Sequence, residues 1–201
     1  MTSDELRELI AVGYETRGVE FKGPGARTEN AFLARVVRAL LGMANRRDGG
    51  IVILGVNDDH HRLVPAGLDV SQLRSWAYDD VADAIARYAD PSIAFQLDTV
   101  NMDVMDFVVF HVDEFEDVPI LCKRDYQNIL TRGACYVRSK RKPETSEISA
   151  HEDFRALLDL ATEKSLAKWV ATGERAGVEL VARPGAPIDR TRFADERAGW
   201  K

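Results

Sequence analysis

The chain has 201 residues, of which 30% are charged, and a formal net charge of −6 at pH 7. This length suits one well-buried domain with a terminal extension, and no run of 18 or more apolar residues is present to form a membrane-spanning helix. The first ten residues lack the basic and apolar regions of a signal peptide, and the two cysteines form no CxxC pair. We therefore expect a cytoplasmic protein without a structural zinc site.

The charges are unevenly distributed along the chain. Residues 51–120 contain 14 acidic and 3 basic side chains, whereas residues 121–150 contain 7 basic and 3 acidic ones. An acidic segment beside a basic one suits a divalent metal next to a track of phosphate-binding side chains. A solvated acidic surface explains the same pattern.

Helical and alternating patterns follow one another through the first half of the chain. Thr2 or Ser3 can cap a helix that ends near Gly13. Val19 and Phe21 alternate with charged residues, which predicts a short half-buried strand. A second helix is predicted over 31–45, a strand over 51–54, a turn with a short partner strand over 60–67, and a helix over 71–88 capped by Ser71.

The second half contains shorter apolar runs. A hairpin is predicted from strands over 94–100 and 106–112, followed by a strand pair over 118–122 and 134–138, a helix from Ser146 or Ser149 to residue 172, and a weak strand over 178–181. We expect one domain over 1–172 and an extension over 173–201, with the Pro- and Gly-rich end mobile or bound to a partner.

The run of residues 51–54 is continuously apolar, which is typical of a strand covered on both faces. Gly49 and Gly50 supply a turn before it, and Asn57, Asp58 and Asp59 follow it. Polar side chains directly after a central strand are a common place for a functional site. A core strand followed by a solvated acidic turn is the alternative.

Three carboxylates can converge if the strands over 19–22 and 51–54 are neighbours. Glu20 lies on the first strand beside Lys22, Glu15 precedes that strand, and Asp58 follows the second. Carboxylate oxygens are the ligands that Mg²⁺ and Mn²⁺ prefer, and a metal held in this way can polarise a phosphoryl oxygen. Lys22 would then stabilise charge that develops on the phosphate. Chance proximity of surface acids is the alternative.

Basic side chains after residue 120 form the candidate phosphate track. Tyr126 or Tyr136 could stack on a base beside it. A solvated basic loop is the alternative. The candidate track consists of Lys123, Arg124, Arg132, Arg138, Lys140, Arg141 and Lys142.

Several short blocks in order resemble the Schlafen AlbA_2 domain over about residues 10 to 140. The blocks are Glu15 separated by four residues from Glu20-Phe21-Lys22, then Met43-Ala44-Asn45, Gly49-Gly50, Ile51 to Leu54, Gly55-Val56-Asn57-Asp58 and Tyr136-Val137-Arg138. The resemblance implies an α+β fold with a mixed sheet flanked by helices and a nucleic-acid-binding function.

In animal Schlafen proteins two glutamates and an aspartate form a metal-dependent ribonuclease site that acts on structured RNA such as tRNA. The resemblance places these roles on Glu15, Glu20 and Asp58, with Asn57 or Asp59 as less favoured third positions. It implies Mg²⁺ or Mn²⁺ as cofactor and RNA as the favoured substrate, with single-stranded DNA as the other. Because the animal proteins have two related lobes and this chain has room for one, a homodimer would supply both walls of the groove.

The sequence also departs from the family pattern. The zinc-binding Cys and His residues of the animal proteins have no counterpart, and a longer turn containing His60 and His61 replaces the usual Gly-x-x-x-Gly. These histidines could be a further ligand or base, or exposed turn residues. Two functions therefore stay open beside the endonuclease: a non-catalytic DNA- or RNA-binding regulatory module, and an interaction protein that binds another protein through its acidic middle and C-terminal tail.

Overall fold

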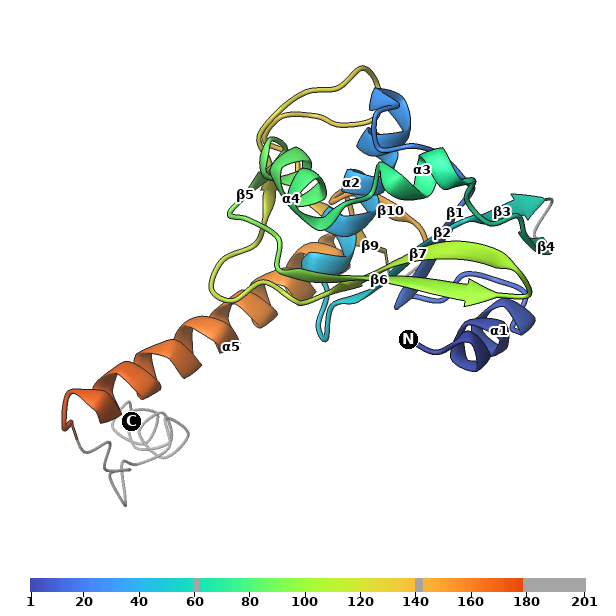
Figure 1. Ribbon diagram of the computed structural model, residues 1–201. Coiled ribbons are helices and arrows are strands. Elements are labelled where there is room, and N and C mark those ends of the chain that lie inside the picture. The colour runs from blue at the N-terminus through green and yellow to red at the C-terminus, as the bar shows by residue number, and fades with distance from the viewer. Residues whose placement is uncertain (60–61, 140–142, 179–201) are drawn as a thin grey trace, which may run out of the picture. The chain divides into compact units, whose positions relative to one another are not determined.

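The computed structural model describes residues 1–59, 62–139 and 143–178, and the chain divides into two compact units, Met1–Ser165 and Leu166–Lys201. The first unit contains the sheet (Figure 1). Both pockets discussed below are lined by residues of this unit. The helices are α1 (Ser3–Ala11), α2 (Asn30–Ala44), α3 (Val70–Arg74), α4 (Tyr78–Ala86) and α5 (His151–Arg175), and the strands are β1 (Val19–Lys22), β2 (Gly50–Leu54), β3 (Val56–Asp59), β4 (Arg62–Pro65), β5 (Ala89–Asp90), β6 (Phe95–Met102), β7 (Met105–Val112), β8 (Leu121–Cys122), β9 (Tyr136–Arg138) and β10 (Thr145–Glu147).

The central sheet has the strand order β1-β2-β7-β6. Strand β1 pairs in parallel with β2, so that Glu20 lies opposite Val52, whereas β2–β7 and β7–β6 are antiparallel. The predicted mixed sheet, the neighbouring β1 and β2 strands and the β6–β7 hairpin are confirmed. The fold class is α+β, as expected.

The sheet separates two apolar cores, with α2 on one face and α1 on the other (Figure 1). Val52 and Leu54 pack in the α2-side core, and Ile53 packs in the α1-side core. Strand β2 is therefore covered on both faces, which explains its continuous apolar sequence. Strand β1 is different, because Val19 and Phe21 enter the α1-side core and leave the intervening Glu20 on the α2 side.

Gly55 separates β2 from β3 with a left-handed φ of 103°. A Cβ at this position would lie 2.9 Å from the Phe107 ring and 3.0 Å from Leu68 Cδ1, so a side chain would be both strained and crowded. The chain can therefore leave the central sheet here and form the β3–β4 hairpin. The predicted partner strand of residues 60–67 is present as β4, while His60 and His61 lie outside the described residues.

Three predictions about the elements are wrong. The expected helix over 71–88 is broken into α3 and α4, because Trp76 between them is buried and donates its indole N–H to Gly25 O at 2.9 Å. Asp69, not Ser71, caps α3. The runs over 118–122 and 134–138 form no strand ladder with each other, although Cys122 N donates to Ala134 O at 2.9 Å: β8 pairs with β5, and β9 pairs with β10.

The long C-terminal helix was predicted, and α5 begins at His151 and ends at Arg175. Leu157 and Leu160 join the α2-side core. None of the described helices combines the length and apolar composition that crossing a membrane requires. The predicted strand over 178–181 and the end of the chain lie outside the described residues from position 179 onward.

Candidate functional site

A pocket of about 380 Å³ and another of about 320 Å³ occur in the first unit, and the second contains both predicted glutamates. We name this second one the glutamate pocket. It combines acidic and basic side chains from β1, α2 and the β9–β10 region. Its lining residues are Glu15, Glu20, Lys22, Arg35, Arg38, Glu144 and Thr145.

Glu20 lies at the base of the glutamate pocket and is only 5% exposed. Its Oε2 accepts hydrogen bonds from Arg138 Nη1 at 2.7 Å and from Thr145 Oγ1 at 2.8 Å. Its Oε1 accepts a hydrogen bond from Lys22 Nζ. Both oxygens of this buried carboxylate are thus engaged by donors of the chain itself, as a buried charge requires.

Glu15 is less tightly held. Its Oε1 accepts a hydrogen bond from Phe21 N at 3.0 Å, and its Oε2 lies 3.5 Å from Arg138 Nη2. Its side chain is 21% exposed, against 6% for Glu20. Of the two glutamates, Glu15 is therefore the one that solvent reaches more readily.

The two carboxyl groups have pKa values shifted in opposite directions. Burial, followed by the neighbouring charge of Glu20, raises the pKa of Glu15 above its ordinary value. Burial would also raise the pKa of Glu20, but Lys22 and Arg138, together with Thr145, outweigh it and lower that pKa. Such a pair supplies one firmly ionised carboxylate and one group able to exchange a proton nearer neutral pH.

The β9–β10 hairpin supplies two of the three groups that hold Glu20. In the antiparallel register Arg138 lies opposite Thr145, so both reach the same carboxylate from adjacent strands. The hairpin packs closely on α2, because a Cβ on Gly42 would come within 2.6 Å of Thr145 Cγ2. Gly42 therefore allows the approach that brings Thr145 to Glu20.

Asp58 does not join the glutamates. It lies on β3 opposite Leu63, and cross-strand partners share a face of the hairpin. Leu63 packs in the α1-side core, as does Val56 two residues before Asp58. Asp58 is therefore directed to the α1 side, while Glu20 lies on the α2 side, and the expected convergence of three carboxylates is not found.

The described residues contain no group of three or more His, Cys, Asp or Glu side chains that could hold a metal ion. Glu15, Glu20 and Glu144 line the pocket with carboxylates but do not form such a group, and the oxygens of Glu20 are already bound to Lys22, Arg138 and Thr145. The donor set of a closed Mg²⁺ or Mn²⁺ site is thus incomplete in this geometry. Binding of either metal stays a prediction.

The structure changes the predicted phosphate track. Arg138 is buried and ion-paired with Glu20, so it positions that carboxylate and is not a surface contact for phosphate. Tyr136 is also buried, which excludes stacking on a base. Of the other members, Lys123, Arg124 and Arg132 are exposed, while Lys140, Arg141 and Lys142 lie outside the described residues.

Four further residues of the glutamate pocket were missed from the sequence: Arg35, Arg38, Glu144 and Thr145. Arg38 Nη2 donates to Thr145 O at 3.0 Å and its guanidinium lies 5.4 Å from the Tyr136 ring centroid. Arg35 is exposed, one helical turn before Arg38. Arg35 and Arg38 lie outside the apolar stripe of α2, and this position could have indicated from the sequence that they are available for a site. No local pattern indicates Thr145, because it is 125 positions from Glu20 in the chain.

The sequence model of the family described as Schlafen, AlbA_2 matches residues 15–146. The match covers well over half of the chain and includes Glu15, Glu20, Arg138 and Thr145. The chain therefore belongs to the Schlafen AlbA_2 family. A comparison with curated proteins finds no significant match.

Two solved structures have partly similar folds. The DIP2311 protein from Corynebacterium diphtheriae is 14% identical with a TM-score of 0.48, and the match covers 76% of this chain but 27% of that protein. The N-terminal domain of a RecG-related protein from Nitrosomonas europaea is 21% identical with a TM-score of 0.47, and the match covers 75% of this chain and 96% of that domain. Both TM-scores lie below 0.5, so neither likeness bears on function.

Proposed function

We propose that this chain binds nucleic acid, with RNA favoured over single-stranded DNA, on the face that carries the glutamate pocket. Family membership supports the proposal, and the observation that carries it is the set of three cationic side chains that line the glutamate pocket beside its three glutamates. Lys22, Arg35 and Arg38 all line this pocket, although the chain as a whole is acidic. Lysine and arginine side chains bind phosphate groups with a strength that falls as salt rises.

The binding proposal is tested with fluorescently labelled tRNA, single-stranded RNA and single-stranded DNA over a range of salt concentrations. Arg35→Gln should weaken binding and reduce the slope of log affinity against log salt by about one unit, because one phosphate contact is lost. Arg7→Gln is the matched control, since Arg7 is an exposed arginine on α1 that pairs with Asp4 and Asp103. Equal slopes for Arg35→Gln and Arg7→Gln would contradict this interface.

The second candidate is a divalent-metal-dependent endonuclease. The adjacency of Glu15 and Glu20, with opposite pKa shifts, favours it, because such a pair can hold charge and exchange a proton at one place. Glu15 is the carboxylate with room for a further contact. A bound Mg²⁺ or Mn²⁺ would polarise a phosphodiester and lower the pKa of a bound water.

Cleavage is tested by incubating the protein with tRNA, single-stranded RNA and DNA, with Mn²⁺ or with chelator. The nuclease proposal expects metal-dependent cleavage that Glu15→Gln abolishes while binding persists. Asp58→Asn shows whether the aspartate on the other face takes part, as the family resemblance implies. Full cleavage by Glu15→Gln, or cleavage in chelator, would leave the non-catalytic binding module.

A homodimer is proposed as the form that supplies both walls of a nucleic-acid groove. Light scattering behind a sizing column, with and without RNA, tests it, and a monomer in both states would contradict it. We place the protein in the cytoplasm, where Cys122 and Cys135, both free thiols in this structure, would stay reduced. Burial raises the pKa of the Cys135 thiol to about 11, so this cysteine is unreactive.

A further inference from the structure

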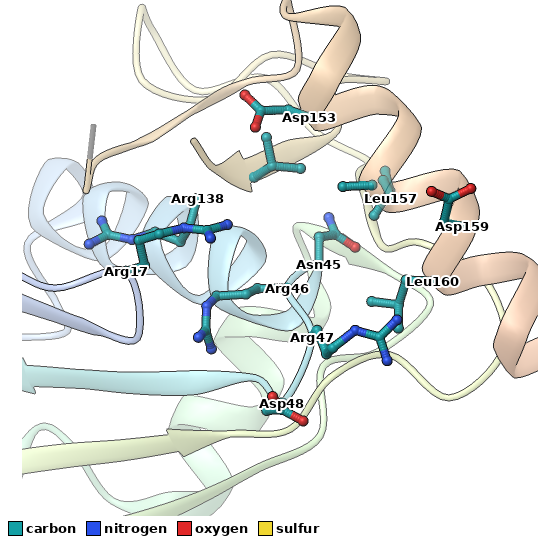
Figure 2. A pocket seen from close by; sticks show the side chains of 12 residues that line it. Arg17, Asn45, Arg46, Arg47, Asp48, Arg138, Asp153, Leu157, Asp159 and Leu160 are labelled. Atoms are coloured by element: carbon teal, nitrogen blue, oxygen red, sulfur yellow. The ribbon is translucent and has the colours of Figure 1, made fainter. Parts of the chain in front are cut away.

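The other pocket introduced above, of about 380 Å³, has Arg138 in its lining. Arg138 also pairs with Glu20 of the glutamate pocket. We name this other pocket the arginine pocket. Figure 2 shows Arg17, Arg46 and Arg138 grouped on one side of it, with α5 on another. Its volume lies in the range of small-ligand sites.

Two of the four arginines in this pocket already have carboxylate partners. Arg47 donates to both oxygens of Glu163, at 3.2 and 2.6 Å, and Arg138 is paired with Glu20. Arg17 and Arg46 differ, because neither forms an ion pair with a carboxylate anywhere in the described part of the chain. Arg46 instead donates from Nη1 to Gly49 O.

The guanidinium of Arg46 is held in place beside other cations. It packs over Gly18, where an added Cβ would lie 3.7 Å from the guanidinium atoms. Burial, then the charges of Arg17 and Arg138, lower the pKa of Arg46, and Asp48 acts in the opposite direction. The half-buried guanidinium of Arg46 therefore lies near the like charges of exposed Arg17 and buried Arg138, and a bound anion would relieve their repulsion.

The rest of the lining limits what can bind. Asp153 and Asp159 project from α5, and Asp48 lies beyond Arg46 (Figure 2). Leu157 and Leu160 add an apolar surface. Carboxylates close to the arginines oppose several phosphate groups gathered at one place, as in a triphosphate, whereas one phosphate group next to an apolar moiety suits both parts of the lining.

We propose that the arginine pocket is a phosphate-binding site in which Arg17 and Arg46 hold the phosphate group of one nucleotide unit. The phosphate comes either from a free nucleoside monophosphate or from the backbone of a nucleic-acid strand. The site is separate from the glutamate pocket and does not depend on the nucleic-acid function proposed above, because a free phosphate ester satisfies the same groups.

The experiment follows the arginine side-chain NMR signals of the full chain during titration with inorganic phosphate, with adenosine 5′-monophosphate and with a single-stranded RNA that has no terminal phosphate. Phosphate and the monophosphate should shift the Nε–H signals of Arg17 and Arg46. Arg17→Gln should weaken monophosphate binding about tenfold or more, because a hydrogen bond between charged groups is removed. Arg17 is exposed, so this variant should fold.

Arg7→Gln is the control of equal charge on α1 and should bind the monophosphate as the wild type does. If the RNA without a terminal phosphate shifts the same two signals, the nucleic-acid backbone is a source of the phosphate. If the monophosphate shifts them and this RNA does not, the ligand is a free nucleotide. Absence of any shift with phosphate and monophosphate would overturn the site. Equal affinity of Arg17→Gln and Arg7→Gln would also overturn it, whatever the result of the RNA-binding test at Arg35.

Discussion

The glutamate pocket and the arginine pocket differ in whether their charged side chains are paired within the chain. In the glutamate pocket, Glu20 is buried but is matched by Lys22, Arg138 and Thr145. In the arginine pocket, Arg17 and Arg46 are held near a third cation, Arg138, without carboxylate partners of their own among the described residues. The charges of the glutamate pocket are therefore paired within the folded chain, whereas Arg17 and Arg46 in the arginine pocket can pair with the anionic ligand proposed above. Substitutions in the glutamate pocket should therefore change mainly the free energy of unfolding, and substitutions of Arg17 or Arg46 should change mainly ligand binding.

The largest effect on stability is expected from Arg138→Met. This change removes the buried guanidinium that bonds Glu20 Oε2 at 2.7 Å and Thr16 O at 2.8 Å, and leaves a buried carboxylate with less compensation. The free energy of unfolding in urea should fall by about 3–5 kcal/mol. Glu20→Leu combined with Arg138→Met should recover part of the loss, and a single variant as stable as the wild type would contradict this role of Arg138.

A smaller loss is expected from Thr145→Val, which keeps the shape of the side chain but removes the hydroxyl donor to Glu20. A hydrogen bond to a charged group contributes about 1.5–3 kcal/mol, and urea unfolding should show a loss of that order. Thr145→Ser is the matched control because it retains the donor at 2.8 Å from Glu20 Oε2. Equal losses for Val and Ser would assign the effect to packing against Gly42 instead.

The pH dependence of stability should separate the two glutamates. The folded pKa of Glu20 lies below its ordinary value of 4.5, so its contribution is present above that value and is lost as pH falls through the lowered pKa. The folded pKa of Glu15 lies above 4.5, so ionising Glu15 reduces stability as pH rises from 4.5 through the raised pKa. Urea unfolding of the wild type and of Glu15→Gln across this range should show that second decline in the wild type alone.

The coupling of the two glutamates has a direct measurement. In Glu20→Gln the pKa of Glu15, followed by carboxyl NMR shifts, should fall toward its ordinary value, because one of the two causes that raise it is removed. An unchanged Glu15 pKa would mean that the two carboxyl groups do not interact.

The smallest effect is expected from Arg47→Gln. Arg47 and Glu163 are both more than half exposed, with side-chain exposures of 55% and 61%, so water and salt screen their attraction. The urea midpoint should stay close to that of the wild type even though the pair lies at the arginine pocket. A large loss would show that α5 is held in place by this pair and less by Leu157 and Leu160.

Local patterns in the sequence predicted several elements well, because the regular spacing of apolar residues shows which side chains of an element are buried. The apolar run of residues 51–54 predicted β2, and the alternation over 19–22 predicted β1 beside it. The prediction for residues 71–88 failed because Trp76 hydrogen-bonds Gly25 across 51 positions, a contact that no helical periodicity records. The strand pairing of Arg138 also failed, since β9 finds its partner in β10.

The sequence predicted only the part of the candidate site whose residues lie close together along the chain. Glu15, Glu20 and Lys22 lie close together along the chain, so strand geometry alone brings them to one place. The position of Asp58 depends on the bend at Gly55 and on pairing with Leu63, which turn it to the other face. The family pattern supplies the three acids in order but contains no information about which face each one takes.

The sequence by itself determined the α+β class, the family and the pair of glutamates beside Lys22, because short-range spacing and apolar periodicity carry them. The tertiary structure alone decided that Arg138 is a buried partner of Glu20 and that Arg17 and Arg46 share a second pocket. The physical reason is that a buried charge must find its partner in space, and here the partners are 118 positions apart in the chain.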